Sequence, residues 1–496
     1  MSNLIADAIS AHQAGRLTEA EALYRQILDA EPALADIRYN LGLIHGQLGR
    51  PWDAVREISA ALESRPDFGQ GWFMLCEFAD IIEQHELNSF AATQAVRLLP
   101  DNPRAWLRHG LAFSRLERPE QAIEAYRRAV DLDPWLVKAW VNLCVTYKSI
   151  GRYSEAETAI RRAIAAAGEP IPDETGDEVD EAAFSYLHWH LALIELLSGR
   201  YKEGFSHFRA RFRGGTDWKR FESDRPLWRG EDLRGKTILV LIEQGFGDAV
   251  MLCRYLHWLK ADGARVIFQA QPALLPLFAG WPGADEVSAF GARLEASYDY
   301  HTAIFDLPHR FGATYETVPR AVPYLSAPPG DTESVLPDAG GLKIGVIWAG
   351  QPENTRGRNR SVPLEILAEI FKTKPCQFFS LTRDKRAGDA ELIKKLPLTD
   401  LGPLLTDFGV TAQFMDQMDL VISCDTATAH LAGALGKTVW TLLPFVPDWR
   451  WALEREDNVW YPTMRLFRQS QRDVWQDVVA RVAAALGQWV AEGQNE

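Results

Sequence analysis

Residues of the same chemical kind recur every 34 positions along the first part of the chain. Small residues let neighbouring helices approach closely, tryptophans fill the gaps between them, and proline cannot continue a helix. The pattern predicts a stack of two-helix hairpins, in which the two cysteines of the small-residue set are packing residues. The sets are Pro32, Pro66, Pro100 and Pro134; Ala8, Gly42, Cys76, Gly110 and Cys144; Trp72, Trp106 and Trp140; and Ala20, Ala54, Ala122 and Ala156.

The regular period is interrupted after the fifth hairpin. Residues 168–183 are acidic, contain two prolines and show no apolar period, which indicates a loop. A degenerate sixth hairpin is expected at about 184–214, because residues 199–201 repeat the turn at 151–153. The expected division is a helical solenoid and a connector, residues 1–214 and 215–235.

From residue 236 the pattern changes to short apolar runs that alternate with amphipathic stretches. Continuous apolar strands separated by helices are typical of a parallel sheet covered on both faces. A Gly- and Pro-rich break at 322–342 divides the region into residues 236–325 and 342–496. The sequence predicts two doubly wound halves that face each other across a cleft, with ligands at the carboxyl ends of the strands. The predicted strands are 237–242, 265–269, 302–306, 343–348, 377–381, 419–423 and 438–443.

Composition excludes several classes of function. The net charge of −14 argues against a large phosphate-backbone interface. The five cysteines are scattered and form no CxxC pair, so neither a disulfide framework nor a zinc site is suggested. Residues 1–3 lead into a helical pattern rather than a signal peptide, and no apolar run approaches the roughly 20 residues of a membrane span. We expect a cytoplasmic protein. Asp131 and Asp133 have the spacing of a metal-binding DxD but end a repeat helix, so no metal is expected.

Asp248 is the first candidate for chemistry. It follows Gly245 and Gly247 directly after the first predicted strand and opens the next helix. A carboxylate in that place, facing a cleft, could serve as general base on an acceptor hydroxyl. The position suits an ordinary helix-terminal Asp equally well.

A basic loop follows the predicted strand 343–348. It contains Arg356, Arg358 and Arg360 within five residues. Guanidinium groups match the geometry of phosphate oxygens, although such loops are often only solvated. Because ligands bind at this edge of such sheets, we favour an oxyanion site that includes Arg358 and Arg360.

The segment after the predicted strand 419–423 carries the strongest signal. Asp425, Thr426 and Thr428 stand at a helix start, where hydroxyls and free amides form an anion site. His430 lies one turn further and could donate to a phosphate or ribose oxygen. Asp425 could instead be a cap, and His430 a structural residue.

An aromatic and Arg-rich tract at 444–467 follows the last predicted strand. Such residues could stack on a base or sugar and clamp its oxygens. The same tract could be a lid packed on the core, and its composition does not separate the two interpretations.

With these motifs, residues 236–487 resemble the bacterial heptosyltransferase group, glycosyltransferases with two Rossmann-like domains (the GT-B type). The chain departs from the family motif Asp-Thr-Gly-x-x-His by having Ala427 in place of glycine. The resemblance implies a base, Asp248; a diphosphate contact, Arg360; and nucleotide contacts, Asp425, Thr426 and His430.

The whole arrangement is similar to bacterial fusions of tetratricopeptide repeats with a glycosyltransferase, of the flagellin-modifying kind. Their strings EQGxGD, RNRS and DWRW match at 243–248, 358–361 and 448–451. The layout is also analogous to the O-linked N-acetylglucosamine transferases, whose repeats carry an asparagine ladder. Asn40 and Asn142 share the corresponding repeat position here and are the candidate acceptor contacts.

We therefore expect an α-solenoid of tetratricopeptide repeats followed by a two-Rossmann glycosyltransferase domain. The expected reaction is an inverting, metal-independent transfer of a sugar from a nucleotide-activated donor, a substrate rather than a cofactor. The acceptor would be a Ser or Thr hydroxyl of a protein held by the repeats, a flagellin-like surface protein being one candidate. The alternatives are a non-catalytic repeat scaffold with a retained glycosyltransferase fold and a lipopolysaccharide heptosyltransferase-like enzyme.

Overall fold

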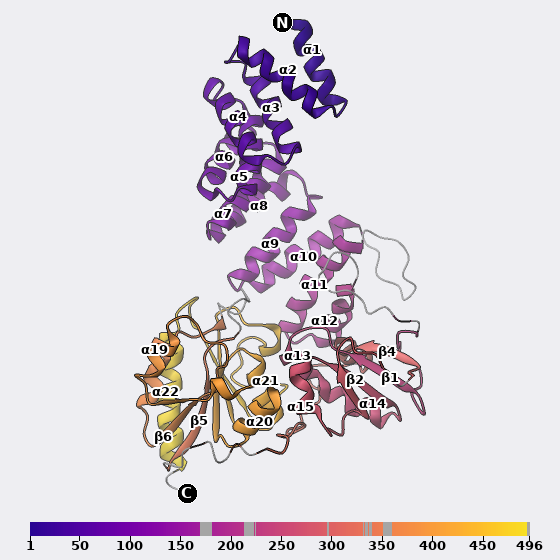
Figure 1. Cartoon of the computed structure of the whole chain (residues 1–496), viewed down its shortest axis with the longest axis vertical. Coiled ribbons are helices and arrows are strands. Elements are labelled where there is room, and N and C mark those ends of the chain that lie inside the picture. Colours follow the sequence, from indigo (N-terminus) through magenta and orange to yellow (C-terminus); the bar gives the residue numbers. More distant parts are fainter. Residues whose placement is uncertain are drawn as a thin grey trace. The chain divides into compact units, whose positions relative to one another are not determined.

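The chain forms two compact units, Met1–Val179 and Asp180–Glu496 (Figure 1). None of the helices in the described part of the chain is long and apolar enough to cross a membrane. Arg356, Arg358 and most of the acidic loop lie outside the described residues. The computed structural model describes residues 1–168, 181–212, 223, 225–294, 297–330, 332, 336, 340–350 and 360–493.

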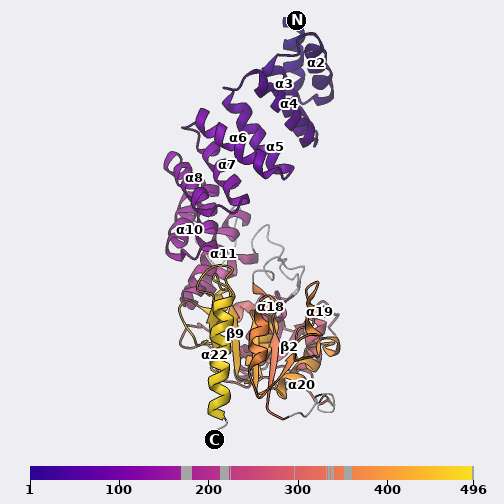
Figure 2. The same ribbon diagram turned by 90° about the vertical axis from the view of Figure 1, so that its left-hand side faces the viewer.

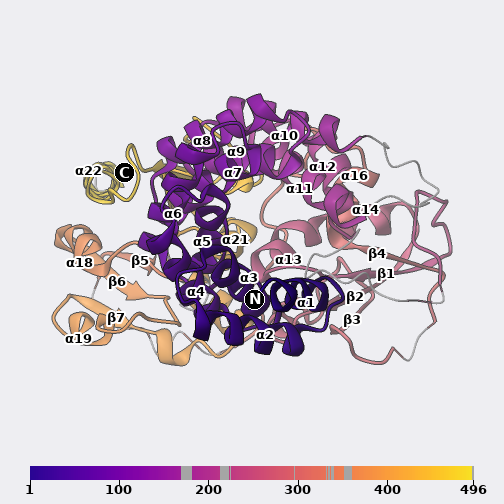
Figure 3. The same cartoon turned by 90° about the horizontal axis from the view of Figure 1, so that it is seen from above.

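The first unit is a helical solenoid whose consecutive helices pack in pairs, as Figures 2 and 3 show. Each hairpin places its small residue at the helix contact, and the first four place a proline after the second helix, as the period predicts. The helices are α1 (Ser2–Gln13), α2 (Leu17–Ala30), α3 (Ala35–Gln47), α4 (Pro51–Ser64), α5 (Gly69–Ile81), α6 (His85–Leu98), α7 (Pro103–Arg115), α8 (Pro119–Leu132), α9 (Val137–Ser149) and α10 (Tyr153–Ala167).

A recurring hydrogen bond explains the tryptophan register. In three successive repeats the indole Nε1 of the tryptophan donates to the carbonyl of the proline six residues earlier. Arg38 stands at the same repeat position, and its Nε donates to the Pro32 carbonyl at 2.8 Å. This hydrogen bond thus links the first helix of each of these four repeats to the turn that precedes it. The tryptophan bonds are Trp72 to Pro66 (2.8 Å), Trp106 to Pro100 (2.7 Å) and Trp140 to Pro134 (2.9 Å).

The small-residue position is set by close helix packing. A Cβ on Gly42 would lie 2.6 Å from a side-chain carbon of Ile58, and one on Gly110 would lie 2.4 Å from the ring of Tyr126. Cys76 and Cys144 fill the same position and are buried. The structure therefore confirms that these two cysteines are packing residues.

The second unit begins with the hairpin α11 (Glu181–Leu197) and α12 (Tyr201–Phe208), followed by the 3-10 turn η1 (Arg209–Phe212). The sequence pattern assigns this hairpin to the end of the solenoid, whereas its contacts group it with the second unit. The reason is its aromatic face. Phe208 stacks on Phe305 at 5.1 Å and Tyr201 stacks on Trp460 at 5.6 Å between ring centroids.

The first sheet of this unit has the order β3-β2-β1-β4, and all its pairs are parallel. Its strands are β1 (Thr237–Leu241), β2 (Arg265–Ala270), β3 (Glu286–Ala289) and β4 (Tyr300–Ala303). Its helices are α13 (Phe246–Leu252), η2 (Cys253–Tyr255), α14 (Leu256–Ala261), η3 (Pro272–Leu274), α15 (Leu275–Phe278), η4 (Ile304–Asp306) and α16 (Leu307–Arg310).

The second sheet has the order β10-β9-β8-β5-β6-β7 and is also parallel throughout. Helix α22 packs on η6 and β10, while α21 packs on β8 and β9. The strands of the second sheet are β5 (Leu342–Ile347), β6 (Cys376–Ser380), β7 (Leu398–Asp400), β8 (Leu420–Cys424), β9 (Val439–Leu443) and β10 (Met464–Arg468). Its helices are α18 (Leu364–Leu367), η6 (Ala368–Lys372), α19 (Asp389–Ile393), η7 (Gly402–Leu404), α20 (Phe408–Asp416), α21 (Ala427–Ala434), η8 (Trp449–Trp451) and α22 (Gln476–Gly493).

Candidate active site

Two helices that follow strand ends bring the two sheets together. Helix α13 follows β1, α21 follows β8, and the two helices pack on each other. Gly247 permits this approach, because a Cβ there would lie 2.8 Å from His430 Cδ2 and 3.3 Å from Ala427 Cα. The second glycine of the EQGFGD string is thus needed for packing between the halves. Residues at the carboxyl edges of both sheets meet here, where parallel sheets bind ligands.

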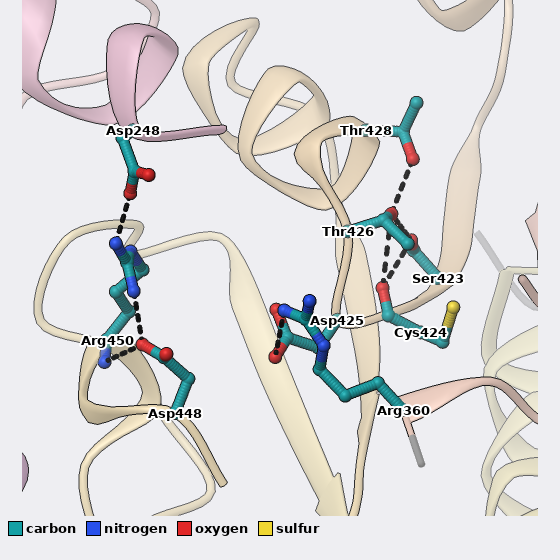
Figure 4. Close-up of polar contacts among 9 residues, drawn as sticks. All are labelled: Asp248, Arg360, Ser423, Cys424, Asp425, Thr426, Thr428, Asp448 and Arg450. Atoms are coloured by element: carbon teal, nitrogen blue, oxygen red, sulfur yellow. Dashed lines mark hydrogen bonds and ion pairs between the residues drawn. The ribbon is translucent and has the colours of Figure 1, made fainter. Parts of the chain in front are cut away.

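Asp248 belongs to the first turn of α13 and is 8% exposed. Its Oδ2 accepts a hydrogen bond from the Gly245 backbone N–H at 3.1 Å, so the carboxylate does cap the helix. Its Oδ1 accepts from Nη2 of Arg450 in the other half (Figure 4). Burial raises the pKa of Asp248, while the charge of Arg450 opposes the rise. The residue is therefore both a cap and a buried charge at the junction of the halves.

Arg450 is shared between two carboxylates. Its Nη1 donates to Asp448 Oδ1 at 2.5 Å, and its Nη2 reaches Asp248 (Figure 4). Its guanidinium also lies 4.6 Å from the ring centre of Trp449. Burial would raise the pKa of Asp448, but the charge and hydrogen bonds of Arg450 hold that pKa below its ordinary value.

A second ion pair joins Arg360 to Asp425. Nη1 of Arg360 lies 3.2 Å from Asp425 Oδ2, and Asp425 is 4% exposed. Burial raises the pKa of Asp425, and Arg360 opposes the rise. The charges of Asp448 and Arg450 also shift the pKa values of Arg360 and Asp425, so the two ion pairs form one electrostatic group.

The hydroxyls at the start of α21 bond to one another. Thr426 Oγ1 lies 2.6 Å from Thr428 Oγ1 and 3.2 Å from Ser423 Oγ (Figure 4). Thr426 is the N-cap residue but its side chain makes no capping bond to the helix. Both threonines are partly exposed. They stand beside Asp425, as the sequence predicts.

His430 is buried between aromatic rings. It stacks on Trp451 with ring centroids 4.9 Å apart, and its Nδ1 lies 3.0 Å from the Tyr461 hydroxyl. Burial lowers its pKa to about 3, so the imidazole is neutral at physiological pH. Any hydrogen bond it donates to a ligand is therefore one from a neutral ring.

A buried ion network anchors the loop that precedes Asp248. Arg211 of η1 pairs with Glu243 at 2.7 Å and with Asp306 at 3.0 Å. Arg211 is only 1% exposed. Burial raises the pKa of Glu243 to about 7, against the opposing charge of Arg211. The first residue of the EQGFGD string thus holds the α11–α12 hairpin to the first sheet.

The candidate acceptor residues lie in the first unit. Asn40 is partly buried in α3, and it opposes the rise that burial causes in the pKa of the Tyr24 hydroxyl. Asn142 is partly buried in α9, and its backbone carbonyl accepts from Thr146 Oγ1 at 2.7 Å. Both asparagines occupy the first helix of their hairpin, as the shared repeat position requires.

Four residues that interact with the candidates Asp248 and His430 have no individual role predicted from the sequence: Asp448, Arg450, Trp451 and Tyr461. All lie in the 444–467 tract, whose position after a strand end and whose Arg and aromatic content were the available signals. The sequence does not show that Arg450 reaches an aspartate 202 positions away. Arg254 is a further buried link, since its Nη1 donates to the Trp460 carbonyl at 2.8 Å.

Family models described as tetratricopeptide repeat match residues 11–75, 88–134 and 113–172. The first part of the chain is therefore a solenoid of these repeats, followed by a parallel-sheet α/β region. Such repeats suggest protein binding.

The chain is similar to Protein FlbA of Caulobacter vibrioides, with 27% identity over 488 residues, covering 91% of this chain and 72% of that protein. Among solved structures, a tetratricopeptide-repeat protein with an unusual peptide-binding site, YrrB, is 21% identical and covers 33% of this chain and 84% of its own, with a TM-score of 0.32. MamA from Desulfovibrio magneticus RS-1 is 24% identical and covers 33% and 92%, with a TM-score of 0.31.

Proposed function

We propose that this chain is a GT-B type glycosyltransferase that moves a sugar from a nucleotide-activated donor to Ser or Thr hydroxyls of a protein. The observation that carries the proposal is the ion pair between Asp248, which follows a strand of the first sheet, and Arg450, which follows a strand of the second. Two parallel sheets with charged residues at their joined carboxyl edges form a natural place for two substrates to meet. The two sheets would act as Rossmann-like halves.

The second half would bind the donor. Arg360 and the start of α21 would hold the diphosphate, because a guanidinium fork and free helix amides both favour anions. They would stabilise the negative charge that develops on the leaving nucleotide, the task that a metal ion performs in other transferases. If the Tyr461 hydroxyl donates its hydrogen to Nδ1 of His430, the neutral ring carries its proton on Nε2. Nε2–H can then donate a hydrogen bond to an oxygen of the nucleotide-sugar.

The first half would supply the base. The carboxylate of Asp248 would take the proton of the acceptor hydroxyl as the oxygen attacks the anomeric carbon. The bond to the nucleotide phosphate breaks in the same step, so one carboxyl group, one glycoside and one nucleotide are formed. Attack opposite the leaving group inverts the anomeric centre. The raised pKa of Asp248 suits this role, since a base works best when its pKa approaches the ambient pH.

The repeats would hold the acceptor protein. Asn40 and Asn142, on the first helices of two hairpins, are the proposed contacts, with a flagellin-like surface protein as a candidate acceptor. A fragment of residues 1–179 should capture the same protein as the full chain, because these residues form a compact unit. Capture by residues 180–496 alone would assign the acceptor to the other unit.

One observation favours a second candidate, a scaffold without catalysis. Arg450 occupies one oxygen of Asp248 and the helix cap occupies the other, an arrangement that packing alone could maintain. Donor binding separates the candidates, because a scaffold has no need to retain it.

Calorimetric titration of the full chain with a panel of nucleotide-sugars tests the proposal. We expect one of them to bind, and Arg360→Ala to weaken that binding about 10–100-fold, as loss of a charge-assisted contact implies. Arg481→Ala is the matched control, since Arg481 lies on α22 and pairs with Asp477 at a half-exposed site. Binding of no nucleotide-sugar, or equal affinity in both variants, would contradict the donor site.

Asp248→Asn should leave donor binding intact and lower the transfer rate about 10²–10⁴-fold. Asparagine keeps an oxygen for the Gly245 N–H but is a far weaker base. Release of free nucleotide diphosphate in the presence of acceptor measures the rate. Full activity in this variant would show that Asp248 is only a cap.

A further inference from the structure

Among the described residues, the charged group where the two sheets meet has more carboxylates than guanidiniums. Asp248, Asp448 and Asp425 share Arg450 and Arg360, and Arg450 serves two of the three aspartates. The side chains of Asp248 and Arg450 are each 11% exposed. Carboxylates that share so few cations in a poorly solvated site repel one another. A further anion that binds here therefore needs a cation beside it to offset this repulsion.

We propose that Arg450 leaves Asp248 for the diphosphate of the bound donor, so that donor binding releases the general base. This inference rests on the proposed function. As Figure 4 shows, Arg450 occupies one oxygen of Asp248, and its charge favours the carboxylate form against the effect of burial. Once the donor is bound, Asp248 is a buried carboxylate without that partner, and its affinity for a proton increases.

The anchoring of Arg450 suits such an exchange. Its loop is held independently of Asp248, because Asn458 Nδ2 donates to the Arg450 carbonyl at 3.0 Å and the Arg450 N–H donates to Asp448 Oδ1 at 3.2 Å. The Trp449 ring lies 4.6 Å from the guanidinium. The end of the side chain can therefore change partner while the backbone and the Asp448 contact stay in place.

The place where the diphosphate would lie is set by Arg360. Arg360 and Arg450 repel each other electrostatically, as do Asp425 and Asp448, so all four belong to one charged neighbourhood. A diphosphate between the two arginines would offset their repulsion and offer each a fork of oxygens. Arg450 would gain a doubly charged partner in place of a singly charged one.

The groups that face Asp248 determine the direction of its response. The charge of Arg450 and the Gly245 N–H favour the carboxylate form, whereas burial and the charge of Asp448 favour the protonated form. From α21, His430 faces Gly247 as a neutral ring and adds no charge. Withdrawing Arg450 therefore raises the proton affinity of Asp248, and donor binding should be accompanied by proton uptake.

The consequence for the reaction is an ordered sequence. Asp248 becomes an effective base only when the donor is in place, so an acceptor hydroxyl that arrives first meets an ion-paired carboxylate. This order protects the donor, because the nucleophile is activated only in the complete complex.

Titration calorimetry of the full chain with inorganic pyrophosphate tests the exchange without knowledge of the nucleotide. Measurements near pH 6.5 in two buffers of different ionisation enthalpy give the number of protons taken up. We expect the wild-type chain to take up more protons than Asp248→Asn, by a fraction of one proton, because a carboxyl whose pKa has risen toward the pH of the measurement is only partly protonated and can still act as a base. Subtraction removes the protons of pyrophosphate itself, which are common to both. Circular dichroism confirms that the variants are folded.

Arg450→Met should abolish the extra uptake and weaken pyrophosphate binding about 10–100-fold. Arg455→Met is the matched control, since Arg455 lies in the same tract and pairs with Asp457 at an exposed site. Equal proton uptake in the wild-type chain and Asp248→Asn, with pyrophosphate bound to both, would overturn the exchange and leave the donor site standing. If neither pyrophosphate nor any nucleoside diphosphate binds, the exchange fails together with the proposed function.

Discussion

Arg211→Met tests what holds the α11–α12 hairpin to the first sheet. The guanidinium of Arg211 neutralises Glu243 and Asp306, and all three side chains are no more than 8% exposed. Methionine keeps the length and the apolar stem but leaves both buried carboxylates without this cation. Breaking a buried ion pair from one side costs about 3–5 kcal/mol. We expect the free energy of unfolding of the second unit to fall by about this amount at alkaline pH.

The pKa of Glu243 gives this loss a pH dependence. Burial raises the pKa from its ordinary value of 4.5 to about 7, so between these values the folded state binds more protons than the unfolded state. The stability that this carboxyl contributes is therefore complete below 4.5 and declines as the pH rises through 7. Without Arg211 the folded pKa rises further, which makes the decline larger. The deficit of Arg211→Met should thus be greater near pH 8 than near pH 5.5.

Urea unfolding of the full chain, followed by circular dichroism and tryptophan fluorescence at both pH values, measures the deficit. Arg234→Met is the control, because Arg234 is 81% exposed and its pair with Asp232 should contribute nothing measurable. Adding Glu243→Gln to Arg211→Met should recover part of the loss. A deficit below about 1 kcal/mol, or one that is the same at both pH values, would refute the reasoning.

Two further predictions concern packing in helices. Gly110→Ala should destabilise the first unit by about 1–3 kcal/mol, because the new Cβ would meet the Tyr126 ring at 2.4 Å; Gly487→Ala, where a Cβ meets nothing within 4 Å, should be neutral or stabilising in the same thermal unfolding assay. Trp106→Phe keeps an aromatic ring but removes the 2.7 Å bond to the Pro100 carbonyl, so we expect a loss of about 0.5–1 kcal/mol in urea unfolding, and no loss would show that the bond is incidental.

The fold was predictable where the pattern is local. The 34-residue period predicts the hairpins because the close helix contact in every repeat needs a small residue at the same position. The continuous apolar runs predict the parallel sheets because both faces of the central strands are buried. The strands β3, β7 and β10 were missed: β3 and β7 are short and have few buried residues, and two arginines interrupt the apolar run of β10. The division at residue 179 also escaped prediction, since the α11–α12 turn resembles a repeat while its aromatic residues pack on the second unit.

The site was predictable only in part. Arg360 and Asp425 follow the neighbouring strands β5 and β8, so strand order brings them to one edge of the second sheet, whereas Asp248 follows β1 of the first sheet. The exchange partner Arg450 depends on a contact between segments 202 positions apart, which no local pattern records. The burial of His430 depends on Trp451 and Tyr461 in the same way. Arg358 lies outside the described residues and stays a prediction.

Intact-mass spectrometry of surface proteins tests the central claim most directly. Cells that make the wild-type chain are compared with cells that make equal amounts of folded Asp248→Asn. We expect at least one protein to carry a sugar-sized mass, or a multiple of it, that is absent when Asp248 is replaced. Identical masses for every surface protein in the two strains would contradict the account, and the chain would then be a repeat scaffold rather than a transferase.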